Sequence, residues 1–341
     1  MAHILAPAVR RARRSSPALR ATVRALAGAT VVAAIAVPLA RKRLRMPAWA
    51  TAATVAAGPL AIAVLSPRTK TRDVVLFTFQ MWAFTIAHEL PYDDPDALRR
   101  RLRIRYPITA DRILGAGELP NVRLQRAISR PGRVTALDRV LSIVHWVWFF
   151  EPHLSLLFVQ ARHVDRFPRA ARQMAATYDL GCAIYYAVPT APPWWASEQG
   201  YMRPPVEQIP ADVAADAAER APAEVRRIMV DVGEGVWGRA WDRMYDLAGG
   251  NPWAAMPSLH FATSLMAALL LAEIGPIPGA LGVGYAAALA FALVYLGEHY
   301  VTDLLAGAAL VALVRRGEPV AEPAVAAVNR ILQRLERIAA A

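Results

Sequence analysis

Two long apolar runs follow one another near the C-terminal end of the chain, separated by a short turn. They occupy residues 261–272 and 280–296, and the turn at 275–279 is made of Gly, Pro and Ile. At a rise of about 1.5 Å per residue, such runs predict two antiparallel helices that cross a bilayer and return. The chain must therefore fold as a helical membrane protein.

The rest of the chain has the same apolar character. Hydrophobic residues make up 56% of the 341 residues, charged residues make up 19%, and the mean hydropathy is +0.28. This composition is too apolar for an ordinary soluble domain and is typical of a polytopic membrane protein. We expect an all-α fold with membrane segments at 25–40, 47–65, 74–86, 140–160, 174–189, 258–272, 277–296 and 300–314.

The formal net charge of +12 raises the question of nucleic-acid binding. The basic residues are almost all arginines and lie between apolar runs, a placement typical of membrane-flanking segments. We therefore expect a membrane and no nucleic acid as the partner. The basic stretch at 1–24 precedes an apolar run that ends at Arg41-Lys42-Arg43, so we expect an uncleaved anchor or a solvated basic arm, not a cleaved signal peptide.

Two histidines bracket the two apolar runs. His260 lies just before the first run and His299 just after the second, so the hairpin places both at one membrane face. Asp303 follows His299 by four residues, on the same face of the next helix. Two imidazoles and a carboxylate suit phosphoryl transfer: one imidazole attacks phosphorus, the carboxylate fixes its tautomer, and the other imidazole protonates the leaving oxygen. Each half alone has a purely structural reading, as a polar helix end or a local hydrogen bond, but the matched pair favours function.

Three sequence blocks resemble a known family. Residues 254–262 read Ala-Ala-Met-Pro-Ser-Leu-His-Phe-Ala, residues 297–303 read Gly-Glu-His-Tyr-Val-Thr-Asp, and residues 189–194 read Pro-Thr-Ala-Pro-Pro-Trp. Over 141–309 the chain resembles the type 2 phosphatidic acid phosphatase superfamily. The Pro-Ser-Leu-His variant and the proline-rich block resemble its inositol phosphorylceramide synthase-like, inositolphosphotransferase branch.

The resemblance implies roles for the three polar residues. It makes His299 the nucleophile, Asp303 its orienting partner and His260 the general acid. It also implies a core of six helices, to which the first two apolar runs add an N-terminal hairpin.

Two departures from the family pattern concern phosphate binding. The phosphatases of the superfamily carry Ser-Arg where this chain has Ala292 and Leu293, and their first block is represented only by Arg203-Pro204, with Ala196 at its lysine position. A phosphate needs cationic or N–H donors, so the residues that supply them stay open. Our candidates for substrate and phosphate contact are Ser258, Arg203, Trp194 and Pro193.

Signals for metals and cofactors are missing from the sequence. Cys182 is the single cysteine, and neither a His-x-x-x-His pattern nor a Gly-rich phosphate loop is present. We expect no cofactor and no metal. His145 lies among tryptophans and phenylalanines at 146–150, which favours an interfacial aromatic belt, with the lining of an acceptor pocket as the alternative.

The expected domains are a basic arm and apolar hairpin at 1–72, a catalytic domain at 73–316 and a C-terminal surface helix at 317–341. Arginines at 162–172 and 315–316 indicate cytoplasmic ends, so we expect the acidic loop at 194–256 and the active site on the extracytoplasmic face of the cytoplasmic membrane. That loop, with its tryptophans, is expected to cover the site. The basic loop at 92–137 conflicts with this topology and has the pattern of an amphipathic interfacial piece.

We expect a membrane phosphotransferase that acts on a lipid-linked phosphate or phosphodiester through a phosphohistidine. The headgroup, such as phosphoinositol, would pass to a lipid or polyol acceptor. One alternative is a phosphatase for a lipid phosphate or polyprenyl diphosphate, since water can replace the acceptor. Another is a non-catalytic lipid carrier or scramblase, and the oligomeric state stays open.

Overall fold

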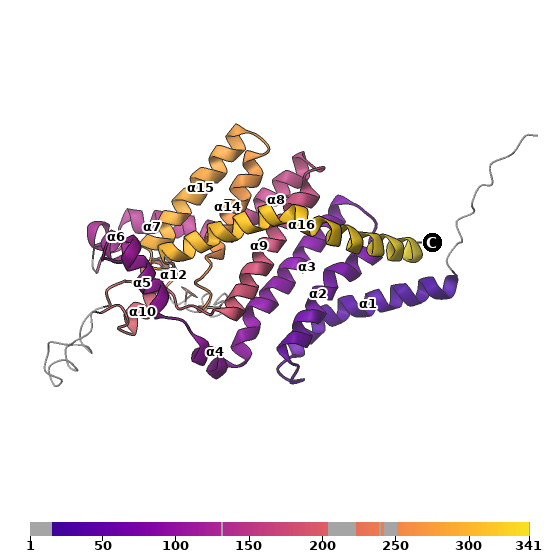
Figure 1. Cartoon of the computed structure of the whole chain (residues 1–341), viewed down its shortest axis with the longest axis horizontal. Helices are drawn as coiled ribbons and strands as arrows, with labels where there is room; N and C mark the ends of the chain where they lie inside the picture. Colours follow the sequence, from indigo (N-terminus) through magenta and orange to yellow (C-terminus); the bar gives the residue numbers. More distant parts are fainter. Residues whose placement is uncertain (1–15, 131, 204–222, 239, 242–250, 341) are drawn as a thin grey trace, which may run out of the picture. The chain divides into compact units, whose positions relative to one another are not determined.

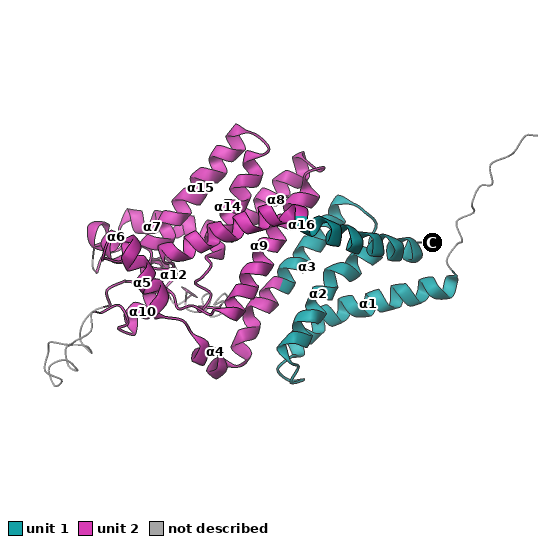
Figure 2. Cartoon of the chain, viewed as in Figure 1, with its two compact units in different colours: residues 1–83, 320–341 teal, residues 84–319 magenta. Residues whose placement is uncertain are grey.

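The computed structural model describes residues 16–130, 132–203, 223–238, 240–241 and 251–340 (Figure 1). Over these residues the chain forms helices, and backbone pairing between strands is limited to isolated bridges. The expected all-α fold is confirmed. The chain forms two compact units, unit 1 with residues 1–83 and 320–341 and unit 2 with residues 84–319 (Figure 2).

Unit 1 is built on a helical hairpin. Helix α1 (Pro17–Ala40) is capped by the Ser16 side chain and packs against α2 (Ala48–Leu65). The first part of α3 (Lys70–Glu89) and the last part of α16 (Val301–Ala340) belong to the same unit. Small residues in the core let these helices approach closely, and Leu332 and Leu335 pack onto them. The expected surface helix at 317–341 is thus the continuation of α16.

Unit 2 contains the remaining helices and the first part of α16. They are η1 (Leu90–Asp93), α4 (Pro95–Arg101), α5 (Arg105–Leu114), α6 (Pro120–Ile128), α7 (Ala136–Val147), α8 (Glu151–Arg162), α9 (Phe167–Ala187), α10 (Pro193–Glu198), α12 (Ile228–Trp237), α14 (Leu259–Ala272) and α15 (Pro276–Tyr295). The expected catalytic domain at 73–316 overlaps this unit.

The centre of unit 2 is the hairpin of α14 and α15, which the apolar runs predicted. Gly275 precedes Pro276, and a proline at a helix start loses no hydrogen bond, so the chain turns and enters α15 at once. The two helices then pack closely. A Cβ added to Gly282 would lie 2.7 Å from the Cα of Ala268, so only glycine fits this crossing.

The apolar run at 140–160, expected as one segment, is broken. Helices α7 and α8 meet at a bend of 50°. Pro152 lies in the first turn of α8, where a proline is tolerated, but its missing N–H cannot continue the preceding helix. The bend leaves His145 in the last turn of α7, facing the start of α14.

The basic loop at 92–137 folds into helices α4 to α6. Its apolar side chains Ile108 and Leu119 pack into a cluster with Met202, Val225 and Tyr300, and Tyr300 immediately follows His299. The amphipathic pattern seen in the sequence therefore covers the segment that leads into α16.

By length and composition, three helices of the described chain can cross a membrane: α1, α2 and α15. The bent pair of α7 and α8 makes a fourth. The other expected segments lie in α3, α9, α14 and the first half of α16. The chain is a polytopic membrane protein, and the six-helix count of its core stays a prediction.

Candidate active site

The two histidines singled out in the sequence lie side by side. His260 is in the first turn of α14 and His299 lies two residues before α16. The Nδ1 of His260 and the Nε2 of His299 are 3.1 Å apart, and the planes of the two rings meet at 62°. The α14–α15 hairpin thus brings together groups that are separated by 39 residues of sequence.

Asp303 completes the array. Its Oδ2 lies 3.4 Å from the Nδ1 of His299 and accepts the backbone N–H of Tyr300 at 2.9 Å. The side chain is fully buried, and Oδ1 has no hydrogen-bond partner in the described part of the chain. If Nδ1–H of His299 donates to Asp303, Nε2 is an acceptor, and His260 must then present N–H at its Nδ1. The lone pair on Nε2 of His299 then lies next to the proton on Nδ1 of His260.

Ser258 joins the two halves of the site. Its side chain caps α14 by accepting the N–H of Phe261, and its own N–H donates to the carbonyl of Asp303 at 2.9 Å. A Cβ at Gly307 would lie 2.8 Å from the Ser258 carbonyl oxygen, so α16 can approach only because this residue is glycine. Ser258 is fully buried. Its O–H can still donate, and the phosphate contact expected for it stays a prediction.

Asp111 of α5 holds the start of α16. Its carboxylate accepts the N–H of Val301 and of Thr302, both at 2.8 Å, and also the Thr302 hydroxyl. The first N–H groups of a helix lack intrahelical partners and carry partial positive charge, so a buried carboxylate is well placed there. Asp111 is fully buried. It therefore fixes the helix that carries Asp303.

Asn121 and Gln125 of α6 hold the segment between α15 and α16. The Nδ2 of Asn121 donates to the carbonyls of Val294, at 2.7 Å, and His299, at 3.0 Å. The Nε2 of Gln125 donates to the carbonyls of Tyr295 and Arg226, and its Oε1 accepts the N–H of Arg226, each at 2.8 Å. Carbonyls at a helix C-terminus need such donors when they are buried.

His145 lies against His260. The two rings are 4.9 Å apart, and the ring of Trp148 lies 4.1 Å from His260 on the same segment. Trp148 is held by its Nε1, which donates to the Thr263 hydroxyl at 2.8 Å. The aromatic belt favoured from the sequence is therefore incorrect for His145, which is buried beside the general-acid candidate because α7 bends there.

A cation is held next to Glu298, the residue that precedes His299. The guanidinium of Arg227 stacks 3.8 Å from the centre of the Trp194 ring, and its Nε lies 3.3 Å from a carboxylate oxygen of Glu298, the neighbour of His299. The backbone N–H of Trp194 donates to the carbonyl of Gly297 at 3.1 Å. Trp194 and Glu298, the two partners of Arg227, are therefore attached to the same turn. The side chain of Arg227 is 16% exposed.

Comparison with known proteins identifies the family. Residues 125–315, more than half of the chain, match the PAP2 superfamily. The chain belongs to the PAP2 superfamily. It is 29% identical to an inositol phosphorylceramide synthase of Candida albicans over 182 residues, which are 52% of this chain and 36% of that protein. It is 26% identical to the inositol phosphorylceramide synthase catalytic subunit of Schizosaccharomyces pombe over 177 residues, 50% of this chain and 38% of that one.

The matched region spans little more than a third of each of these relatives. No solved structure matches the chain. The resemblance to the inositol phosphorylceramide synthase-like branch is confirmed by these two relatives. Asp111 and Asn121, which hold the PAP2 site, lie before the matched region.

The proline-rich block of this PAP2 chain connects three segments around the site. The N–H of Arg103 donates to the Pro189 carbonyl at 2.8 Å, and the N–H of Thr190 donates to the Trp253 carbonyl at 2.8 Å. Pro193 is buried at the start of α10, and Trp194 follows it against Arg227. The block thus reaches the site through Trp194.

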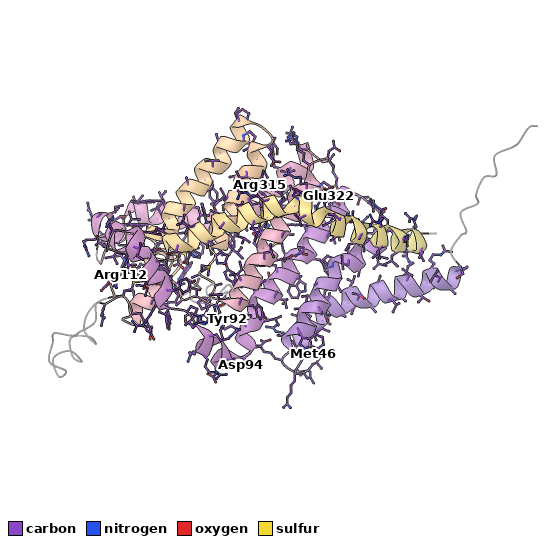
Figure 3. The ribbon with its side chains drawn as sticks, in the orientation of Figure 1. Met46, Tyr92, Asp94, Arg112, Arg315 and Glu322 are labelled. Carbon is purple, nitrogen blue, oxygen red and sulfur yellow. The ribbon has the colours of Figure 1, made fainter. Side chains whose placement is uncertain are left out.

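Arg203, the other expected phosphate ligand, lies in the turn after α10. Its N–H donates to the Gly200 carbonyl at 3.3 Å, and its guanidinium lies close to the same residue. The neighbouring turn is held by Arg112 of α5, which donates to the Met202 carbonyl at 2.5 Å (Figure 3). A contact between Arg203 and phosphate stays a prediction.

Part of the loop at 194–256, expected as a cover for the PAP2 site, is described. Helix α12 packs on α7, where Trp237 stacks on Trp146 at 5.3 Å and Trp241 lies 5.6 Å from the same ring. Residues 204–222 and 242–250 of this loop lie outside the described residues. The covering role stays a prediction.

The described side chains at the PAP2 site bring together two imidazoles and a carboxylate, with a guanidinium next to Glu298. Within the described ranges, no group of three His, Cys, Asp or Glu side chains is arranged to hold a metal ion. Sequence reasoning found the first three groups. It missed Arg227, Asn121 and Asp111, whose sequence neighbourhoods contain no motif.

Proposed function

We propose that this protein is a membrane phosphotransferase that moves a phospho-headgroup from a lipid donor through a phosphohistidine. The observation that carries the proposal is the contact of 3.1 Å between His260 and His299, with Asp303 behind His299. A nucleophile, a proton donor next to it and a carboxylate that fixes the tautomer form a covalent-catalysis unit.

In the first step, Nε2 of His299 attacks phosphorus and the bond from phosphorus to the leaving oxygen breaks. His260, which enters this step as an imidazolium, passes the proton on Nδ1 to that oxygen and becomes a neutral imidazole. In the second step an acceptor hydroxyl attacks the phosphohistidine, and His260 takes the hydroxyl proton back. Atoms and charge balance without any further reactant. The phosphorus must enter between the two rings, where it replaces the hydrogen bond that they form with one another.

Arg227 is our proposed phosphate ligand. A phosphodiester and its transition state carry negative charge, and an arginine held by stacking and a carboxylate is pre-organised to meet it. Trp194 and Glu298 provide both supports at 3.8 Å and 3.3 Å. Arg227 would thus supply the cation that Ala292 and Leu293, both fully buried, do not.

Transfer, not hydrolysis, is our proposal for the second step. Both relatives reported above are named as inositol phosphorylceramide synthases, and this supports transfer of a group such as phosphoinositol to a lipid or polyol hydroxyl. A phosphatase would use the same first step and admit water in the second. A non-catalytic carrier or scramblase has no need for an assembled His260, His299 and Asp303.

The distribution of arginines supports an active site on the extracytoplasmic face of the cytoplasmic membrane. Glu273, thirteen residues after His260, lies about 20 Å along α14 from the site. There it pairs with Arg169 at 2.7 Å and with Arg315 at 2.5 Å, the latter on α16 (Figure 3). Arginines gather at cytoplasmic ends of membrane helices, so the histidines belong to the other face.

A partitioning assay tests the proposal. Purified protein in detergent is given a phospholipid donor and increasing inositol, glycerol or a lipid alcohol, and both transfer product and water-soluble phosphate release are measured. Product that rises at the expense of release is expected. Constant release without any adduct would identify a lipid phosphatase, and neither product nor release, with lipid movement between leaflets, would identify a scramblase.

A further inference from the structure

A second polar site lies in unit 1, which does not contain the histidine array. A partly open cavity of about 390 Å³ is lined by the first turns of α1, the end of α2, the start of α3 and the last turns of α16. This volume is in the range that holds a small-molecule headgroup. Its lining includes the apolar residues Val64 and Leu65 at the end of α2.

The cavity is strongly basic. Its charged lining residues are Arg24, Arg68, Arg72, Arg337 and Glu336. Four positive charges and one negative charge leave a net charge of +3. The C-termini of α2 and α16 each contribute only about half of a negative charge, so the cavity remains positive.

Arg72 is the buried centre of this cluster. Its side chain is 8% exposed, and its Nη2 donates to Glu336 at 2.6 Å. Arg68 donates to the same carboxylate at 3.0 Å, so one carboxylate serves two guanidinium groups. The Nε of Arg72 has no hydrogen-bond partner in the described chain. Two guanidinium groups that share one carboxylate keep N–H donors that this carboxylate does not use, and an oxyanion in the cavity could accept them.

The position of the cavity indicates the source of that anion. Helices α1 and α2 are both long and apolar enough to span a membrane, and α1 begins at the same end of the hairpin where α2 ends. The cavity therefore lies at headgroup depth, with apolar side chains beside its arginines. We propose that it binds one anionic phospholipid, with the phosphate on Arg72 and Arg68 and the glycerol end against Val64 and Leu65.

The full-length protein in uncharged detergent tests this by native mass spectrometry and thermal unfolding. It is titrated with phosphatidylglycerol and, separately, with phosphatidylcholine of the same acyl chains. We expect one phosphatidylglycerol per chain, bound about tenfold or more tightly than phosphatidylcholine. The double variant Arg68→Gln/Arg72→Gln should lose this preference. The matched control Arg99→Gln/Arg100→Gln removes two exposed charges from α4 and should keep it.

Three further arms separate the alternatives. Arg337→Gln leaves the pair of Arg72 and Glu336 intact, so it tests the cavity even if the double variant does not fold. His299→Ala should keep the bound lipid, since that lipid is not at the histidine site. Glycerol 3-phosphate should bind far more weakly than phosphatidylglycerol. The proposal would be overturned if the two phospholipids bound equally well or if the cavity variants kept the wild-type preference. It would also be overturned if His299→Ala lost the lipid, or if glycerol 3-phosphate bound as tightly as the lipid.

Discussion

The side-chain amide of Asn121 donates a hydrogen bond of 3.0 Å to the main-chain carbonyl of His299, 178 residues later in the sequence. The same amide donates to Val294 at the end of α15, and Asn121 is fully buried. One side chain from the basic loop thus holds the backbone on both sides of the turn that presents the nucleophile candidate.

We predict that Asn121→Ala lowers turnover per folded molecule about 10- to 100-fold, because a shift of His299 by about 1 Å is enough for such a loss. KM should change little, since Arg227 stays in place. The measurement is kcat and KM after quantification of folded protein. Gln199→Ala, at an exposed position after α10, is the control. Unchanged kcat would show that the hydrogen bond does not position His299.

His299→Ala should abolish turnover while the protein stays folded, because it removes the Nε2 that lies 3.1 Å from His260. In the wild type, a rapid quench with labelled donor should trap an acid-labile, base-stable phosphoramidate at residue 299. His163→Ala, at the end of α8, is the control histidine. A phosphoryl group trapped at another residue would refute the assignment.

His260→Ala should slow the reaction about 100- to 10,000-fold for donors with poor leaving groups. A donor with an activated leaving group, which needs no proton, should recover most of this loss. The test compares kcat for the two donor classes in variant and wild type. Equal losses on both would mean that His260 positions the substrate and does not deliver a proton.

Arg227→Gln should reduce kcat/KM about 10- to 100-fold, the effect of losing one charge-assisted hydrogen bond to phosphate. Arg227→Lys keeps the charge but loses the stacking on Trp194 and the planar donor pair, so it should recover only part of the activity. Arg99→Gln removes an exposed arginine and serves as the control. Wild-type kinetics in Arg227→Gln would assign phosphate binding to another cation, with Arg203 the next to test.

Turnover should survive a strong chelator unchanged. His299 supplies the nucleophile and His260 the proton, so the chemistry needs no metal-bound water. The assay compares initial rates with and without chelator, and again after magnesium or manganese is added. An absolute requirement for either ion would contradict the proposed mechanism.

The sequence alone determined the features that depend on local spacing. Asp303 follows His299 by four residues, and this short spacing keeps the two side chains within reach of each other even though His299 lies two residues before α16. Two apolar runs joined by Gly275 and Pro276 make a hairpin because both helix length and turn are local properties. The pairing of His260 with His299 follows from that hairpin.

The tertiary structure decided which other groups contact the histidines or the backbone next to them. Asp111, Asn121 and Arg227 come from segments without a motif, and His145 reaches His260 only because α7 and α8 meet at a bend. Buried N–H and carbonyl groups need hydrogen-bond partners, and any polar side chain that packs against them can be that partner. The partner is therefore chosen by how the helices pack, a long-range property that residue spacing does not encode.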